Sequence, residues 1–264
     1  MGLRVTMLGT GAALPDPDRN HSSIVVSVRG RNYLFDCGHG ATHQMVRANI
    51  DPSTVNVIFL SHLHFDHIAD FAFFMISTWM ANRQDVPVVV GPPDTRHFVD
   101  SLLVNGAYRK DIEARVQYPQ RRKNLAVLTP DVRECAPGLV YEDDLVKVQA
   151  CYVEHIPREI SPCFGLRVDT IDGESVVFSG DTAPCDRLVE MARGADLKIM
   201  TDSVEVAQAI ASAADQYGMH YQLLLEVELK RIRRGIGQFT GYAKVNDRVV
   251  ANAELMCAKR SIDV

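Results

Sequence analysis

The 264-residue chain lacks the sequence features of secreted proteins, of membrane-spanning proteins and of strongly basic proteins that bind nucleic acids or anionic lipids. Its six cysteines form no CxxC pair, and its apolar runs stay well short of the roughly 18 residues that a membrane span needs. The first residues, MGLRVTMLGTG, show no charged segment followed by an apolar one, so we expect no secretory signal there. The net charge of −5 offers no overall attraction to phosphate backbones or anionic lipids. We therefore expect a cytoplasmic protein with reduced, mostly core-filling thiols and no membrane partner.

Short apolar runs alternate with turn residues and helical stretches over the first 200 residues. The predicted strands are Leu3–Leu8, Ser23–Val28, Asn32–Asp36, Val55–Leu60, Val86–Val90, Leu145–Val153, Cys163–Val168, Ser175–Phe178 and Asp196–Met200. The predicted helices are Gly40–Ile50, His67–Asn82 and Asp186–Gly194, while residues 93–135 mix helix and polar loop without a clear order. This succession predicts a layered α/β domain with its chemistry at strand ends.

The pattern changes after about residue 205. Glu205–Tyr217 is an alanine-rich helical stretch, and the residues from Tyr221 onward alternate as in an antiparallel β meander of three strands. We expect a metal-binding domain over residues 1–204, a connecting helix over 205–219 and a β-strand fragment over 220–264.

The segment SHLHFDHIAD, residues 61–70, concentrates three of the nine histidines around one aspartate. His62 and His64 are two residues apart, so both imidazoles can reach one ion from an extended segment. Asp66 and His67 follow where a helix begins and offer ligands to a second ion nearby. Imidazole with carboxylate suits zinc, one or two ions, with manganese or iron as alternatives. The competing interpretation is a surface loop that holds three histidines by chance.

Two further candidate ligands also follow predicted strands. His155, in VEHIP, comes after Leu145–Val153, and Asp181, in FSGDT, follows Ser175–Phe178 and a glycine. His155 could equally be a surface histidine, and Asp181 a helix N-cap or turn former.

These motifs together resemble a known family. LGTGAALPDPDRNHSS (8–23), NYLFDCGHGATHQM (32–45), SHLHFDHI (61–68), EHIP (154–157) and SGDTAPCDRLVEMARGADLKIM (179–200) resemble the metallo-β-lactamase fold, especially its ribonuclease Z and arylsulfatase-like branch. The resemblance implies a four-layer αββα domain. It also implies that His62, His64 and His155 bind one zinc, that Asp66 and His67 bind a second, and that Asp181 bridges them. Asp36, in FDCG, would orient a ligand from behind, although satisfying polar groups of the core is an equally good account of it.

The resemblance implies a hydrolase in which a metal-activated water attacks the substrate. Asp66 would orient that water or take its proton. The expected substrate is a phosphodiester, of a nucleic acid or of a small molecule, and sulfate esters and lactones are further substrates within the family.

The sequence departs from the family pattern after residue 200, which leads us to expect a truncated fold. The family continues with a His-Glu pair and later a last zinc-binding histidine, whereas this chain reads Thr201-Asp202 and has only His220 downstream, a weak candidate. Residues 220–260 resemble instead the last strands of hotdog-fold 3-hydroxyacyl-acyl carrier protein dehydratases, without their catalytic residues. The alternative function is therefore a metal-binding protein with impaired catalysis, whose β tail serves as an interaction module. Because the three-stranded tail has an apolar face and strand edges to cover, a homodimer through the β tail is a further expectation.

Overall fold

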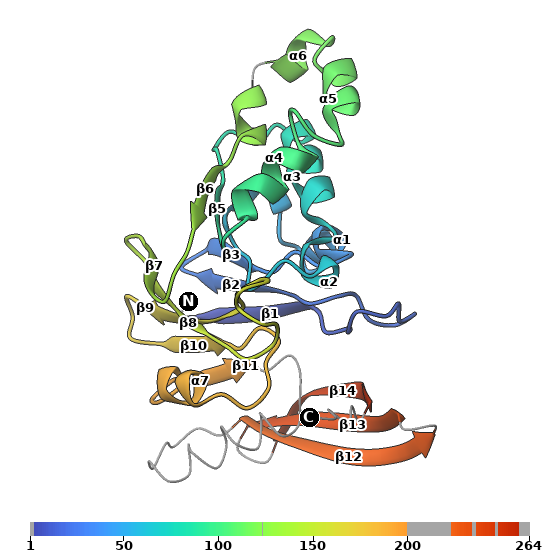
Figure 1. Cartoon of the computed structure of the whole chain (residues 1–264), viewed down its shortest axis with the longest axis vertical. Helices are drawn as coiled ribbons and strands as arrows, with labels where there is room; N and C mark the ends of the chain where they lie inside the picture. Colours follow the sequence, from blue (N-terminus) through green and yellow to red (C-terminus); the bar gives the residue numbers. More distant parts are fainter. Residues whose placement is uncertain (1–2, 123, 200–222, 234–235, 246–247, 259–264) are drawn as a thin grey trace.

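The computed structural model describes residues 3–122 and 124–199, and the backbone of residues 223–233, 236–245 and 248–258. Two β-sheets lie at its centre with helices on their outer faces (Figure 1). The first sheet has the order β1 (Arg4–Gly9), β2 (Ser23–Val28), β3 (Arg31–Phe35), β4 (Val55–Phe59), β5 (Val88–Gly91) and β6 (Asp131–Glu134). The second has the order β11 (Leu197–Ile199), β10 (Ser175–Phe178), β9 (Phe164–Thr170), β8 (Val146–Tyr152) and β7 (Gly138–Glu142).

The helices connect and cover these strands. They are α1 (Ala41–Arg47), α2 (Phe65–Ile68), α3 (Phe71–Met80), α4 (Thr95–Leu102), α5 (Arg109–Arg115), α6 (Pro119–Arg122) and α7 (Asp186–Met191), with 3₁₀ turns η1 (Pro52–Thr54) and η2 (Leu125–Leu128). The stretch that the sequence left unordered thus contains three short helices.

Three hydrophobic cores separate the four layers. In β4, Ile58 packs in the core beneath α1 and α3, while Val57 and Phe59 on the opposite face join the core between the two sheets. Val177 of β10 packs against Leu188 of α7 in the third core. Strands buried on both faces read as continuous apolar runs, which explains why the sequence revealed them. The predicted α/β class with the αββα layering is confirmed.

Local chemistry sets the ends of several elements. The β2–β3 hairpin turns at Arg29 and Gly30, which both have positive φ as a two-residue type I′ turn requires. β3 ends one residue earlier than predicted because Asp36 has a φ of 56°. The predicted helix over 67–82 was wrong in one respect, since it is divided into α2 and α3. The division falls at Asp70, whose amide donates to the Cys37 carbonyl and whose carboxylate accepts from the Thr42 amide.

Two strands escaped prediction because they carry little apolar pattern. Only Val132 of β6 is buried, and β7 is exposed or half-buried throughout. They lie at the edges of their sheets, where a strand can be polar on both faces.

The C-terminal strands β12 (Leu223–Arg233), β13 (Ile236–Val245) and β14 (Arg248–Ala258) pair antiparallel in sequence order, as the meander prediction required. The predicted helix over 205–219 and His220 lie outside the described residues. The domain boundaries, the hotdog resemblance and a homodimer through the β tail stay predictions.

The described cysteines are free thiols, and Cys37, Cys163 and Cys185 are buried among apolar neighbours. Burial raises the pKa of Cys135 to about 12, so that thiol stays protonated. Among the residues that the structure describes, no helix is long and apolar enough to cross a membrane.

Arg83 is a buried cation that holds the helical layer to the first sheet. Its side chain is 2% exposed, and burial lowers its pKa to about 10. The guanidinium donates to the carbonyls of Pro52 and Val55 and to the Thr78 hydroxyl. It thus joins the segment after α3 to the turn that begins β4.

We predict that Arg83→Met lowers the free energy of unfolding by about 3 kcal/mol, because it leaves buried carbonyls without donors. Urea unfolding followed by the fluorescence of Trp79, the single tryptophan, measures the change. Arg133→Met is the matched control, since Arg133 is 47% exposed and pairs with Asp131 on the surface. The interpretation fails if the two variants unfold at the same urea concentration.

Candidate metal centre

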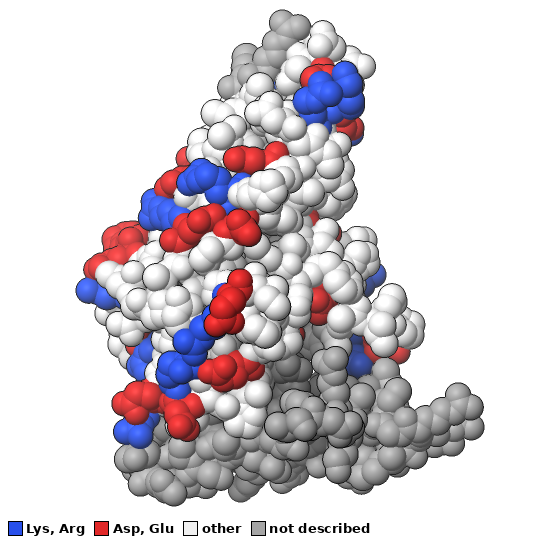
Figure 2. Space-filling model, viewed as in Figure 1, with Lys and Arg blue, Asp and Glu red and all other residues white. Residues whose placement is uncertain are grey.

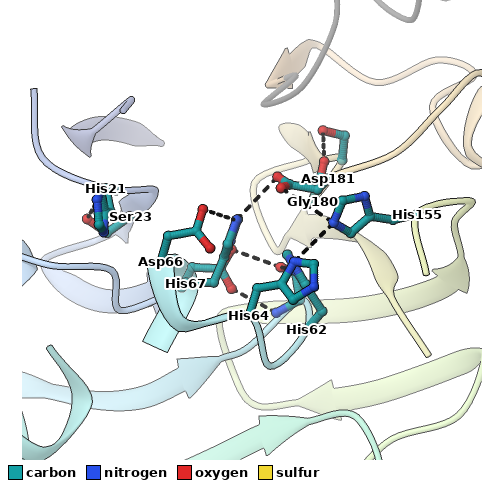
Figure 3. Close-up of polar contacts among 12 residues, drawn as sticks. His21, Ser23, His62, His64, Asp66, His67, His155, Gly180 and Asp181 are labelled. Atoms are coloured by element: carbon teal, nitrogen blue, oxygen red, sulfur yellow. Dashed lines mark hydrogen bonds and ion pairs between the residues drawn. The ribbon is translucent and has the colours of Figure 1, made fainter. Parts of the chain in front are cut away.

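The candidate ligands meet because the strands that carry them end at one place (Figure 3). His62 and His64 follow β4, His155 follows β8, and Asp181 follows β10. The loops after β8 and β10 are joined directly, since the Ala183 amide donates to the Glu154 carbonyl over 2.6 Å. Gly180, with a φ of 57°, lets the β10 loop approach closely. A Cβ at Gly180 would lie 2.9 Å from the Phe164 carbonyl oxygen.

His62, His64 and His155 form a first donor group, with one ligand atom of each within 4.8 Å of the others. Nε2 of His155 lies 3.1 Å from Nδ1 of His64. His64 and His155 are exposed, whereas His62 is buried. The group is therefore open to solvent on one side.

A second donor group contains His62, His67 and Asp181. Nε2 of His67 lies 3.3 Å from Oδ1 of Asp181, whose Oδ2 lies 3.8 Å from Nε2 of His155. Asp181 thus stands between the two groups. Asp66 is 5% exposed and lies at the margin of the second group, with its Oδ2 3.7 Å from Nε2 of His67.

The state of the His62 imidazole tests whether the residues of the two donor groups suit a metal ion. Its Nε2 atom is buried and has no hydrogen-bond partner among the described residues. Burial, helped by the neighbouring imidazole of His67, lowers its pKa to about 2, so the ring is neutral. Burial and His155 also lower the pKa of His64. A neutral imidazole with an unused buried nitrogen is the form in which histidine binds metals, so the residues fit a cation.

The pKa of His67 is shifted in the opposite direction from that of His62. Burial alone would lower its pKa, but Asp36 and Asp181 outweigh this effect and raise it to about 11. The pKa of Asp181 is lowered, although burial opposes the shift, because His67 donates to it. The imidazolium compensates the buried carboxylates, and a metal ion at this place would release its proton.

Asp36 contacts this arrangement from behind the candidate ligands. Its Oδ2 lies 2.6 Å from Nδ1 of His67 and accepts from the Ser61 hydroxyl over 2.9 Å. The Ser61 hydroxyl also lies 3.0 Å from Nδ1 of His62. Both imidazoles are thereby turned so that their Nε2 atoms face the ligand groups. The sequence did not single out Ser61, although its place between a buried strand and the first histidine was a usable signal.

The chain is similar to known proteins over most of its length. The family model described as "Anti-Pycsar protein Apyc1" matches residues 3–226. A ribonuclease Z of Mycobacterium marinum (strain ATCC BAA-535 / M) is 35% identical over 203 residues, which cover 75% of this chain and 70% of that protein. A ribonuclease Z of Mycobacterium sp. (strain KMS) is 36% identical over 212 residues, covering 78% and 72%.

Solved structures show the same fold. The short form of human tRNase Z (ELAC1) superposes with a TM-score of 0.62 and 23% identity, covering 80% of this chain and 88% of that one. YhfI of Bacillus subtilis, described as a metallo-β-lactamase fold protein, gives a TM-score of 0.61 and 18% identity, covering 81% and 82%. The metallo-β-lactamase fold with ribonuclease Z-like sequence is thus confirmed.

We predict that Asp36→Asn weakens metal binding about 10–100-fold, because the amide cannot fix both His67 and Ser61 in their present orientations. Asparagine tolerates the positive φ at this position, so the backbone is preserved. Competition with a chromophoric chelator measures the affinity. Asp70→Asn is the control, a buried carboxylate that accepts the Thr42 amide and, among the described residues, is hydrogen-bonded to none of the candidate ligand side chains. Equal affinities in all three proteins would show that Asp36 serves only the core.

Proposed function

The chain belongs to the family described by the anti-Pycsar protein Apyc1 model, and from this membership we propose that it is a metal-dependent hydrolase of phosphodiesters. The observation that carries the proposal is the buried Nε2 atom of His62, which belongs to both donor groups and has no hydrogen-bond partner in the part of the chain that the structure describes. The ribonuclease Z relatives support the substrate class, because a ribonuclease cleaves a phosphodiester.

The proposed ligands divide into two sets. His62, His64 and His155 would hold one ion, Asp66 and His67 a second, and Asp181 would contact both. Zinc suits these imidazoles and carboxylates, with manganese or iron as alternatives. When bound, the ions lower the pKa of a water and offset the charge that develops on the phosphoryl group.

A side chain of the protein would then accept the proton of the attacking water. Asp66, a buried carboxylate beside the second donor group, would accept a proton from the attacking water as the new oxygen–phosphorus bond forms. The ester oxygen that leaves takes up a proton in turn, so one water is consumed for each bond broken. His64 and His155 lie on the exposed side, where a substrate can enter.

A second candidate is a metal-binding protein with impaired catalysis. It is favoured by the sequence after residue 200, which reads Thr201-Asp202 where the resemblance implies a His-Glu pair. Residues 201, 202 and 220 lie outside the described part of the chain. About one tightly bound ion per chain, with no turnover of any phosphodiester, would favour this candidate.

We predict that chelator treatment abolishes hydrolysis of bis(p-nitrophenyl) phosphate and that added zinc or manganese restores it. His62→Ala should lose metal and lower kcat/KM at least about 100-fold, because the ligand that both groups share is gone. Elemental analysis and p-nitrophenolate release measure these outcomes. His97→Ala, which removes an exposed histidine on α4, should match the wild type. Full activity in the chelated protein would refute the metal dependence.

Asp66→Asn should lower kcat about 10²–10⁴-fold, because the amide cannot accept the proton of the attacking water. The three histidines of the first donor group are untouched, so the variant should keep at least one ion per chain. Steady-state kinetics and elemental analysis of the same sample test both statements. An unchanged kcat would remove Asp66 from the proposed chemistry.

A further inference from the structure

The two candidate ligands from the second sheet, His155 and Asp181, lie on loops that are joined at one place. Glu154 precedes His155, and Ala183 comes two residues after Asp181. The Ala183 amide donates to the Glu154 carbonyl over 2.6 Å, and the two residues form an isolated antiparallel bridge between the loops. Because this bridge is one residue from His155 and two from Asp181, it limits how far the two side chains can move apart.

Thr182 completes the bridge with its side chain. Its hydroxyl oxygen accepts the Glu154 amide over 3.1 Å and donates its proton to the Ala183 carbonyl over 2.7 Å. Both backbone groups of Glu154 are therefore bound to the loop after β10. Thr182 is 2% exposed. Removing a buried hydroxyl of this kind costs free energy, because its partners are left without their hydrogen bonds.

Other contacts between the two loops lie at the surface. Arg187 of α7 donates to the Tyr152 carbonyl over 3.1 Å and pairs with the Glu154 carboxylate, and the Arg187 and Glu154 side chains are 46% and 51% exposed. Arg158 pairs with the same carboxylate. On the face drawn in Figure 2, basic and acidic side chains of the described residues lie next to one another in this manner. Exposed ion pairs contribute little because water and salt screen them, so we expect the buried hydroxyl to hold the loops.

The spacing of the two loops matters because each carries a ligand of a different donor group. His155 belongs to the first group and Asp181 to the second, and Oδ2 of Asp181 lies 3.8 Å from Nε2 of His155 (Figure 3). Distances between a metal ion and its ligands vary by only about 0.2 Å. A small displacement of one loop against the other would therefore disturb both groups.

We propose that Thr182 is a positioning residue of the metal centre, whose hydroxyl fixes the loop of His155 to the loop of Asp181 and so sets the spacing of the two donor groups. The inference rests on the proposed function. It adds a residue outside both donor groups and gives it the joint placement of one ligand from each.

Thr182→Val tests this role, because valine has nearly the same shape as threonine and lacks the hydroxyl. We expect the zinc affinity to fall about tenfold, within the range seen when groups behind metal ligands are removed. Competition with a chromophoric chelator measures the affinity, and elemental analysis gives the number of ions. Thr182→Ser keeps the hydroxyl and should bind zinc as the wild type does.

Thr170→Val is the matched control for the loss of a buried threonine hydroxyl. Thr170 is 8% exposed, and its hydroxyl accepts the Glu174 amide over 3.1 Å. It pairs with Val146 at the start of β8, whereas His155 follows the end of that strand. Both valine variants should lower the urea midpoint of the metal-free protein, but Thr170→Val should leave the zinc affinity unchanged.

Cobalt(II) in place of zinc separates positioning from stability, because its visible absorption depends on the number and arrangement of its ligands. Thr182→Val should change the visible spectrum of the cobalt-loaded protein. Thr182→Ser and Thr170→Val should keep the spectrum of the wild type.

The failure of this inference is distinguishable from the failure of the proposed function. Wild-type zinc affinity and an unchanged cobalt spectrum in Thr182→Val would overturn the role of Thr182 and leave the proposed function standing. An equal loss of affinity in Thr170→Val would reduce the effect to stability and overturn the role as well. If the wild type binds zinc but hydrolyses no phosphodiester, the proposed function fails, while the affinities and spectra still decide the role. A wild type that binds neither metal would overturn both.

Discussion

The structure depends on the burial of the His62 imidazole, whose Nε2 atom has no hydrogen-bond partner among the described residues. A buried nitrogen in this state costs free energy unless something binds it. The elements around His62 are arranged so that other possible metal-ligand atoms lie close to its Nε2 atom. β4 delivers His62 from the core, and the loops after β8 and β10 bring His155 and Asp181 to meet it.

The layered fold makes this placement rigid. The strands beneath the ligands are buried on both faces, between the helical layer and the core shared by the two sheets. Asp36 leaves its strand with a φ of 56°, a conformation that is uncommon for residues other than glycine, and its carboxylate then reaches Ser61 and His67. A backbone conformation of this kind persists only where the surrounding structure stabilises it. Here it places the Asp36 carboxylate so that it orients the His67 imidazole directly and the His62 imidazole through Ser61.

Much of the fold could be predicted because it rests on local patterns. Continuous apolar runs indicated the buried strands, such as Ser23–Val28. The spacing of His62, His64 and His67 indicated side chains that the structure brings together, while their role as metal ligands stays a prediction. The edge strands β6 and β7 could not be predicted, since their residues are mostly exposed and carry no periodicity. Ser61 was missed for another reason. Its role depends on a contact between residues far apart in the chain, the hydrogen bond that its hydroxyl donates to Asp36.

The measurement that tests the central claim most directly is anomalous diffraction from crystals of the metal-loaded protein. The account predicts one ion bound by Nε2 of His62 together with His64 and His155, and a second beside His67, Asp66 and Asp181. Anomalous density at the first position alone would mean that the protein binds one of the two proposed ions. Ions elsewhere, with Nε2 of His62 still unbound, would contradict the account.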